Sequence, residues 1–108
     1  MFFHFSQNNS GGNFAIDEDV AHHVIIESLN ANEANRKAES IGIYFHGVDD
    51  GMDCDCCGDR WYSVWGEGEA EPLIYGDPPE QYVDMWAGKG EPYCHVYYLD
   101  GRKVTYRG

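Results

Sequence analysis

The stretch YCHVYYLDGRKVTY, residues 93–106, decides how this part of the chain folds. Two runs rich in aromatic and β-branched residues, 93–99 and 103–106, flank the tripeptide Asp-Gly-Arg. Asp-Gly between two such runs is a strong local signal for a β-hairpin, because both residues tolerate the positive φ angles of a tight turn. The sequence therefore predicts a hairpin here, and a sheet to which the hairpin belongs.

Upstream of this hairpin the sequence predicts further strands. Residues 2–5 (FFHF) are typical of a short aromatic strand, and residues 9–12 (NSGG) favour a reversal of the chain. Residues 13–16 are then the expected return strand. Residues 20–28 (VAHHVIIES) predict another strand, since they are rich in β-branched residues and follow an acidic turn.

Residues 30–41 change to a helical period, with alanines on one face. Asn30 can cap the helix, Glu33 stands three positions later as in a capping box, and Gly42 suits a C-terminal position of positive φ. One helix on a mainly antiparallel sheet is an α+β fold. We expect this small sheet and helix to carry a cysteine-rich loop between them and the final hairpin.

The length of 108 residues and a hydrophobic fraction of 43% indicate one folded domain over residues 1–108. Within it, residues 66–92 are dense in glycine, glutamate and proline. This composition is typical of an irregular acidic connection.

Nineteen acidic and seven basic residues give a formal net charge of -12. Such a chain repels phosphate backbones and anionic lipid and attracts basic surfaces, so direct nucleic-acid binding is disfavoured. The sequence has no apolar run of membrane-spanning length and no signal-peptide pattern. We therefore expect a cytoplasmic protein whose thiols stay reduced unless a metal holds them.

The stretch DCDCCGDRW, residues 53–61, holds three of the four cysteines. Cys54 and Cys57 form a CxxC pair that can face one metal ion, and the sequence predicts zinc as the cofactor. A tetrahedral site needs two more ligands. The candidates for these places are Cys56, Cys94, His95 and His46.

Three other interpretations of this cluster stay open. A redox pair or a cysteine nucleophile needs a lowered thiol pKa, which the surrounding aspartates oppose. The third is a packed turn in which Arg60 pairs with aspartates and Trp61 enters the core. His22 and His23 are adjacent in a predicted strand, where successive residues face opposite sides of the sheet. They are therefore interpreted as one exposed and one packed histidine, and not as metal ligands.

Four segments together carry a resemblance: FSQNNSGG, EANRKAESIGIYFHGV, DCDCCGDRWY and HVYYLDG. The chain resembles a family of small uncharacterised proteins of tailed bacteriophages, in which a domain of unknown function carries the same series. CxCCGDRW is its most specific part, and the likeness covers residues 2–66 and 93–103. It implies an accessory protein acting in the host cytoplasm, and it supplies no mechanism.

The leading hypothesis is a non-catalytic protein that binds and inhibits or modulates a bacterial host or defence protein with a basic surface. Acidic charge and exposed aromatics suit such an interface. The expected contact residues are Trp65, Tyr75, Tyr82, Trp86, Arg60 and Trp61. The alternatives are a small metal-dependent enzyme using the cysteine cluster with His46 or His95, and a nucleotide-signal sponge using Arg60, Arg102 or Lys103.

Overall fold

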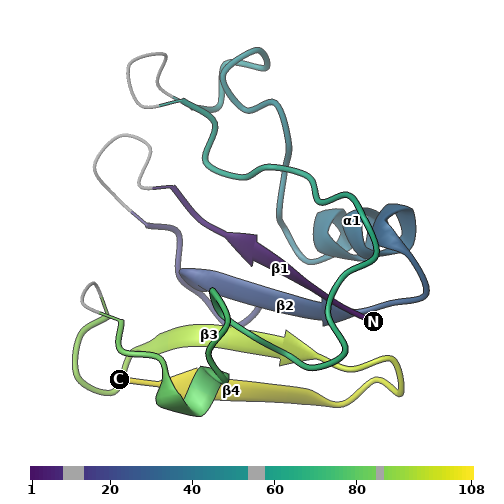
Figure 1. Ribbon diagram of the computed structural model, residues 1–108. Helices are drawn as coiled ribbons and strands as arrows, with labels where there is room; N and C mark the ends of the chain where they lie inside the picture. The colour runs from purple at the N-terminus through teal and green to yellow at the C-terminus, as the bar shows by residue number, and fades with distance from the viewer. Residues whose placement is uncertain (9–13, 54–57, 85–86) are drawn as a thin grey trace.

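A computed structural model describes residues 1–8, 14–53, 58–84 and 87–108 of the protein. These residues form a four-stranded sheet, one α-helix and a short 3-10 helix (Figure 1). The elements are β1 (Phe2–Ser6), β2 (His23–Glu27), α1 (Ala31–Ser40), η2 (Pro79–Gln81), β3 (Pro92–Tyr97) and β4 (Lys103–Arg107).

The strands lie in the order β1-β2-β3-β4, so that β1 and β4 are the two edges of the sheet (Figure 1). β1 pairs antiparallel with β2, and β3 pairs antiparallel with β4. The central pair, β2 and β3, is parallel, and a long connection that includes α1 joins these two strands. The mainly antiparallel α+β fold predicted from the sequence is confirmed, with one parallel pairing at its centre.

The hairpin and the helix form where local signals predicted them. Gly101 has φ 92° in the turn between β3 and β4. At the start of α1, the side-chain oxygen of Asn30 accepts a hydrogen bond from the Glu33 amide at 2.9 Å. Ala34 and Ala38 are fully buried, so α1 lies close against the sheet. No helix in the described ranges is long and apolar enough to cross a membrane.

The predicted return strand is wrong for residues 14–16, which form no strand. β1 pairs with β2 instead, with Phe3 opposite Ile26. The side-chain amide of Gln7 donates to the Ala15 carbonyl at 2.9 Å and to the Ala21 carbonyl at 3.0 Å, and its oxygen accepts from the Ala15 amide. One side chain thus replaces the hydrogen bonds that a return strand would have made.

Each face of the sheet packs against its own hydrophobic cluster. The first cluster contains α1 and Trp61, which is 1% exposed. The second lies on the opposite face and includes Ile74, which is fully buried. Ile74 belongs to residues 66–92, and this segment also forms an isolated bridge between Glu69 and Phe2. The described part of the acidic connection therefore covers the second face of the sheet.

Candidate functional site

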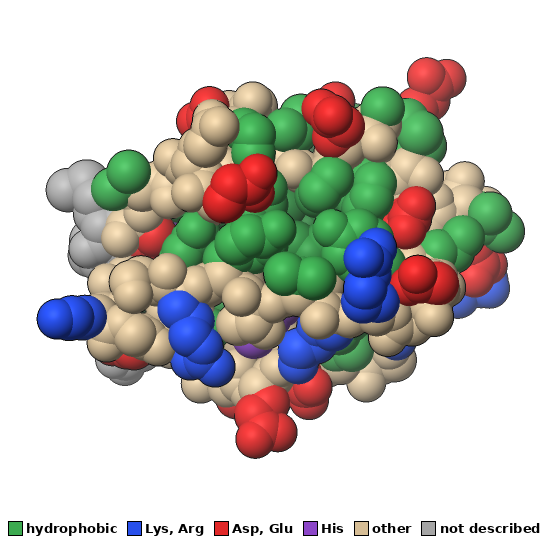
Figure 2. Space-filling view, turned by 90° about the horizontal axis from the view of Figure 1, so that it is seen from below, with side chains coloured by type: hydrophobic (Ala, Val, Ile, Leu, Met, Phe, Trp, Pro, Cys, Tyr) green, Lys and Arg blue, Asp and Glu red, His purple; other side chains and the backbone are tan. Residues whose placement is uncertain are grey.

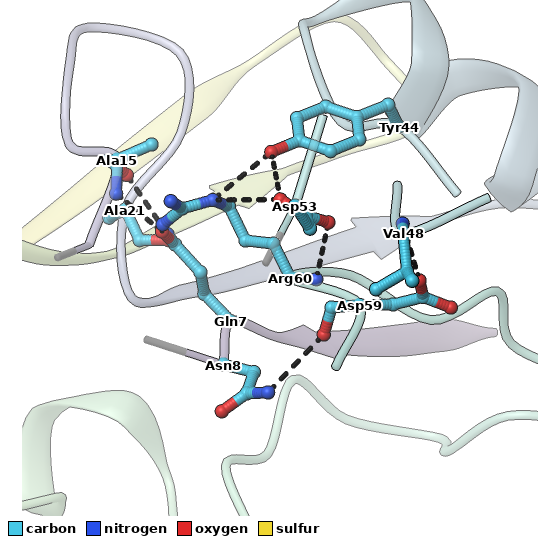
Figure 3. Close-up of polar contacts among 9 residues, drawn as sticks. All are labelled: Gln7, Asn8, Ala15, Ala21, Tyr44, Val48, Asp53, Asp59 and Arg60. Carbon is cyan, nitrogen blue, oxygen red and sulfur yellow. Dashed lines mark hydrogen bonds and ion pairs between the residues drawn. The ribbon is translucent and has the colours of Figure 1, made fainter. Parts of the chain in front are cut away.

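Cys54, Cys56 and Cys57 lie outside the described residues, but hydrogen bonds hold the residues on both sides of them (Figure 3). Asp53 accepts from the Tyr44 hydroxyl and from the Arg60 amide, both at 2.8 Å. Asp59 accepts from the Val48 amide at 2.9 Å. Asp53 and Asp59, on either side of the cysteines, are therefore anchored to residues 44–48.

Arg60 connects this turn to Gln7, the residue that follows β1 (Figure 3). Its Nε donates to the Tyr44 hydroxyl at 3.1 Å, and its Nη1 donates to Gln7 Oε1 at 2.7 Å. Nε also lies 3.8 Å from Asp53 Oδ1, and the Asp53 side chain is fully buried. Burial and the Asp53 carboxylate raise the pKa of the Tyr44 hydroxyl, which therefore stays protonated as a donor. Arg60 thus holds the turn together through its contacts with Tyr44, Asp53 and Gln7.

Cys94 and His95 are not brought together by the structure. They are adjacent in β3 and project to opposite faces of the sheet. Cys94 is fully buried, and burial together with Asp84 raises its pKa to about 12. Both ring nitrogens of His95 have partners, since Nδ1 lies 2.8 Å from Thr105 Oγ1 and Nε2 lies 3.1 Å from the Asp17 carbonyl.

The predicted contact residues differ in their exposure. Trp65 is 84% exposed and Tyr75 is 68% exposed, whereas Tyr82 is half-buried. Trp61 is buried in the first cluster, and Trp86 lies outside the described residues. Among the described members of this set, Trp65 and Tyr75 are therefore the most exposed aromatic side chains.

The basic residues proposed for a nucleotide site are spread over different contacts. The Arg102 guanidinium stacks on the Tyr98 ring at 4.1 Å, and Lys103 Nζ donates to the Glu18 carbonyl. Arg60 belongs to the anchored turn.

Seen from the side of β4, hydrophobic side chains gather at the centre of the molecule with acidic ones around them, and basic ones lie along one side (Figure 2).

β1 is an edge strand, and hydrogen bonds fix which of its backbone groups face outward. The Gln7 amide donates to the His22 carbonyl and the Ser28 amide donates to the Met1 carbonyl, both at 2.8 Å. In an antiparallel pair, hydrogen-bonded and non-bonded residues alternate. The odd-numbered residues of β1 therefore bond to β2, and the even-numbered residues direct their N–H and C=O groups outward.

Two contacts close the ends of this outer edge. Phe2 exchanges backbone hydrogen bonds of 2.7 and 2.8 Å with Glu69, and the Asn8 amide donates to the Arg60 carbonyl at 2.8 Å. Within the described part of the chain, no backbone group bonds to the outward groups between these ends. These groups belong to His4 and Ser6, and we call them the open edge.

The segment 62–65 runs beside the open edge without pairing with it. Asn35 of α1 holds this segment by a reciprocal pair of bonds, because its Oδ1 accepts from the Val64 amide at 2.9 Å and its Nδ2 donates to the Val64 carbonyl at 3.0 Å. A cavity of about 340 Å³ remains between the segment and β1. Its lining residues are His4, Ser6, Tyr62, Ser63, Val64 and Trp65.

A second group of side chains, from the start of β2 and from residue 84, converges on one point. His22 Nδ1 lies 2.6 Å from Asp84 Oδ2, and His23 Nε2 lies 3.8 Å from the same oxygen. One ligand atom from each of the three residues falls within 4.8 Å of the others. We call these three residues the histidine–aspartate cluster. It is the group among the described residues that could hold a metal ion.

His4 supports this cluster from β1. Its Nε2 lies 2.8 Å from His23 Nδ1, and the two rings stack at 5.0 Å. Burial, helped by the nearby histidines, lowers the pKa of His4 to about 4 and that of His23 to about 3. Both imidazoles are therefore uncharged at neutral pH.

Sequence reasoning missed this cluster. It placed His22 and His23 on opposite faces of a strand, but β2 begins at His23. His22 precedes the strand and is not bound by its alternation, so both rings reach Asp84 and lie 4.3 Å apart. The two adjacent histidines could have indicated a metal site. Asp84, however, is 62 positions from His22, and no local pattern connects it to the histidines.

The model of one protein family matches the whole of residues 1–108. The chain belongs to that family, which is described as a domain of unknown function, DUF7296. No curated protein and no solved structure matches this DUF7296 chain. The uncharacterised domain family expected from the sequence is thus shown, and function has to be argued from the residues themselves.

Proposed function

We propose that this protein is a non-catalytic accessory protein of a tailed bacteriophage. It acts in the host cytoplasm, where it binds and inhibits or modulates a bacterial host or defence protein. The bound region is a basic segment of that protein, which enters the cavity beside β1 and bonds to the outward backbone groups of His4 and Ser6. The observation that carries the proposal is that the backbone N–H and C=O groups of His4 and Ser6 face outward beside exposed aromatic side chains.

An extended peptide gains main-chain hydrogen bonds from an exposed sheet edge and gains specificity from side-chain pockets beside it. The open edge offers the N–H and C=O groups of two residues, and the adjoining cavity of about 340 Å³ offers the pocket. Trp65 and Tyr62, which are 84% and 59% exposed, line this cavity. Tryptophan and tyrosine are frequent binding hot spots, so these two side chains supply the contact energy.

Charge determines the kind of segment that fits. The net charge of -12 attracts basic surfaces and speeds encounter with them. Near one end of the open edge, Glu69 pairs with Phe2, and Glu67 and Glu71 are exposed close by in the chain. Lysine and arginine side chains of a bound segment would lie against these carboxylates. An acidic segment would be repelled.

Capture from bacterial lysate at low and at high salt tests the proposal. We expect a partner that is retained at low salt and weakened at high salt, since exposed charges are screened. Trp65→Ala should lower its affinity about 30-fold, which corresponds to a hot-spot loss of about 2 kcal/mol. Leu99→Ala is the matched control, because Leu99 is 59% exposed and lies beyond β3, away from β1.

A second variant tests the backbone contacts. Ser6→Pro removes an outward N–H that the fold does not use, and proline is tolerated in edge strands. We expect the variant to fold and to lose most of the captured partner. Capture that is unchanged by both Trp65→Ala and Ser6→Pro, or no capture at either salt, would contradict the proposal.

A further inference from the structure

We propose that the histidine–aspartate cluster is a metal site, in which His22, His23 and Asp84 bind one divalent first-row transition ion such as Zn²⁺. This site differs from the cysteine site predicted from the sequence. It also does not depend on the proposed function, because binding at the open edge needs no metal.

The donor set and its spacing fit such an ion. Two imidazole nitrogens and one carboxylate are ligands that zinc and non-haem iron take in proteins. Ligand atoms at zinc distances and a tetrahedral angle lie roughly 3.4 Å apart. The Asp84 oxygen lies 2.6 Å from His22 Nδ1 and 3.8 Å from His23 Nε2, so a bound ion would replace the hydrogen bond between His22 and Asp84 and bring the three ligand atoms to a common spacing.

One buried atom of the cluster has no partner that would satisfy it. His23 Nε2 is the buried side-chain nitrogen or oxygen that lacks a hydrogen bond among the described residues, and the His23 side chain is 0% exposed. Leaving a buried polar atom without a partner costs about 1–3 kcal/mol. The atom points toward the Asp84 carboxylate, at a distance too long for a hydrogen bond. A metal ion between them would give His23 Nε2 the partner that it lacks.

The residues around the cluster contact the two imidazoles and would hold them in place as metal ligands. When His23 Nε2 carries the lone pair for the metal, its Nδ1 carries the proton and donates to His4 Nε2 at 2.8 Å. The ring of Tyr82 packs edge-on against His23 at 4.9 Å, and the ring of Phe14 packs on His22 at 4.4 Å. These contacts orient both imidazoles before any ion arrives.

The cluster is also reachable from outside. A cavity of about 330 Å³ is lined by His22, His23, Tyr75 and Tyr82 and by residues at the end of β1. Three protein ligands leave a fourth position of a tetrahedral ion to water. The site would therefore hold an ion with an open position facing this cavity, and the negative charge of the whole protein would favour the entry of a cation.

Zinc titration by calorimetry tests the proposal. Serine first replaces the three clustered cysteines, so that their thiols cannot compete for zinc. The full-length variant Cys54→Ser/Cys56→Ser/Cys57→Ser should still bind one Zn²⁺. Adding Asp84→Asn should weaken that binding about 100-fold, and adding His4→Gln should weaken it about 10-fold. Adding His95→Gln is the matched control for loss of a buried histidine and should leave zinc binding unchanged.

Substitution of Co²⁺ gives an independent readout. In the unsubstituted chain, Co²⁺ bound at the histidine–aspartate cluster should give a spectrum without the near-ultraviolet charge-transfer band of cobalt thiolates. If Asp84→Asn fails to fold, zinc added to the unsubstituted chain should shift the imidazole ¹⁵N resonances of His22 and His23 and leave those of the exposed His46 in place. The proposal is overturned if the triple serine variant binds no zinc, if Asp84→Asn binds it equally well, or if only His46 responds.

Discussion

Burial keeps three histidine side chains of this protein uncharged. It lowers the pKa of His4 to about 4, lowers that of His23 to about 3, and lowers that of His95 as well. Each side chain lies in the sheet and contacts a neighbour through a ring nitrogen. In the unfolded chain a histidine titrates near pH 6.5. The folded and unfolded states therefore differ in bound protons over the range below that pH.

The sign of the resulting pH dependence follows from this difference. Between pH 6.5 and about 4 the unfolded state binds more protons than the folded state, so the free energy of unfolding falls as the pH falls. We expect a loss of about 1–3 kcal/mol per pH unit below pH 6.5 and little change from this source above it. Urea unfolding at pH 7.5 and pH 5 in the presence of a chelator measures the effect.

The variant His4→Gln should reduce this slope, because it removes one of the buried histidines. His46→Gln is the control and should leave the slope unchanged, since His46 is exposed. Equal stability of the unsubstituted protein at the two pH values would show that these histidines are not kept neutral by the fold.

At the scale of elements, α1 has a second role besides covering the sheet. Asn35 makes two hydrogen bonds to Val64 and so ties the segment 62–65 to the helix. The segment would otherwise be available to pair with β1. This attachment keeps Trp65 exposed and the open edge accessible.

We predict that Asn35→Ala lowers the free energy of unfolding by about 1–3 kcal/mol, because it removes two hydrogen bonds that are partly buried. Asn32→Ala is the matched control, since Asn32 is exposed on the same helix and should cost far less. Urea titration followed by tryptophan fluorescence compares the two. Equal effects of the two substitutions would rule out the proposed attachment.

The elements that the sequence predicted are those with local causes. The hairpin depends on Asp100 and Gly101, and the helix on the Asn30 cap, so each could be recognised within a few residues. The pairing of β1 with β2 and the parallel pairing of β2 with β3 join distant segments, and no local pattern specifies them. The turn signal at residues 9–12 predicted a return strand near residue 14, but β1 pairs with the more distant β2 instead.

The same distinction applies to the candidate sites. Trp65 is 84% exposed, and its role as a contact residue stays a prediction. The open edge could not be predicted, because it depends on the segment 62–65 bonding to α1 and not to β1. The histidine–aspartate cluster likewise depends on Asp84, which the fold brings to His22 from 62 positions away.

At the scale of the whole molecule, the protein combines an acidic surface with a sheet whose two edges differ. β4 carries Lys103 and Arg107, and basic residues on an edge discourage unwanted strand pairing. The middle of β1 presents His4 and Ser6 without such charges. The proposed partner therefore binds at β1, whose outer edge is open at His4 and Ser6.

Amide hydrogen exchange followed by NMR tests that claim most directly. We predict slow exchange for the amides of Phe3 and Phe5, which bond to β2, and much faster exchange for those of His4 and Ser6, which face outward. A binding partner should then slow His4 and Ser6 selectively. Equally slow exchange at all four amides in the isolated protein would mean that the edge is already covered, and would contradict the account.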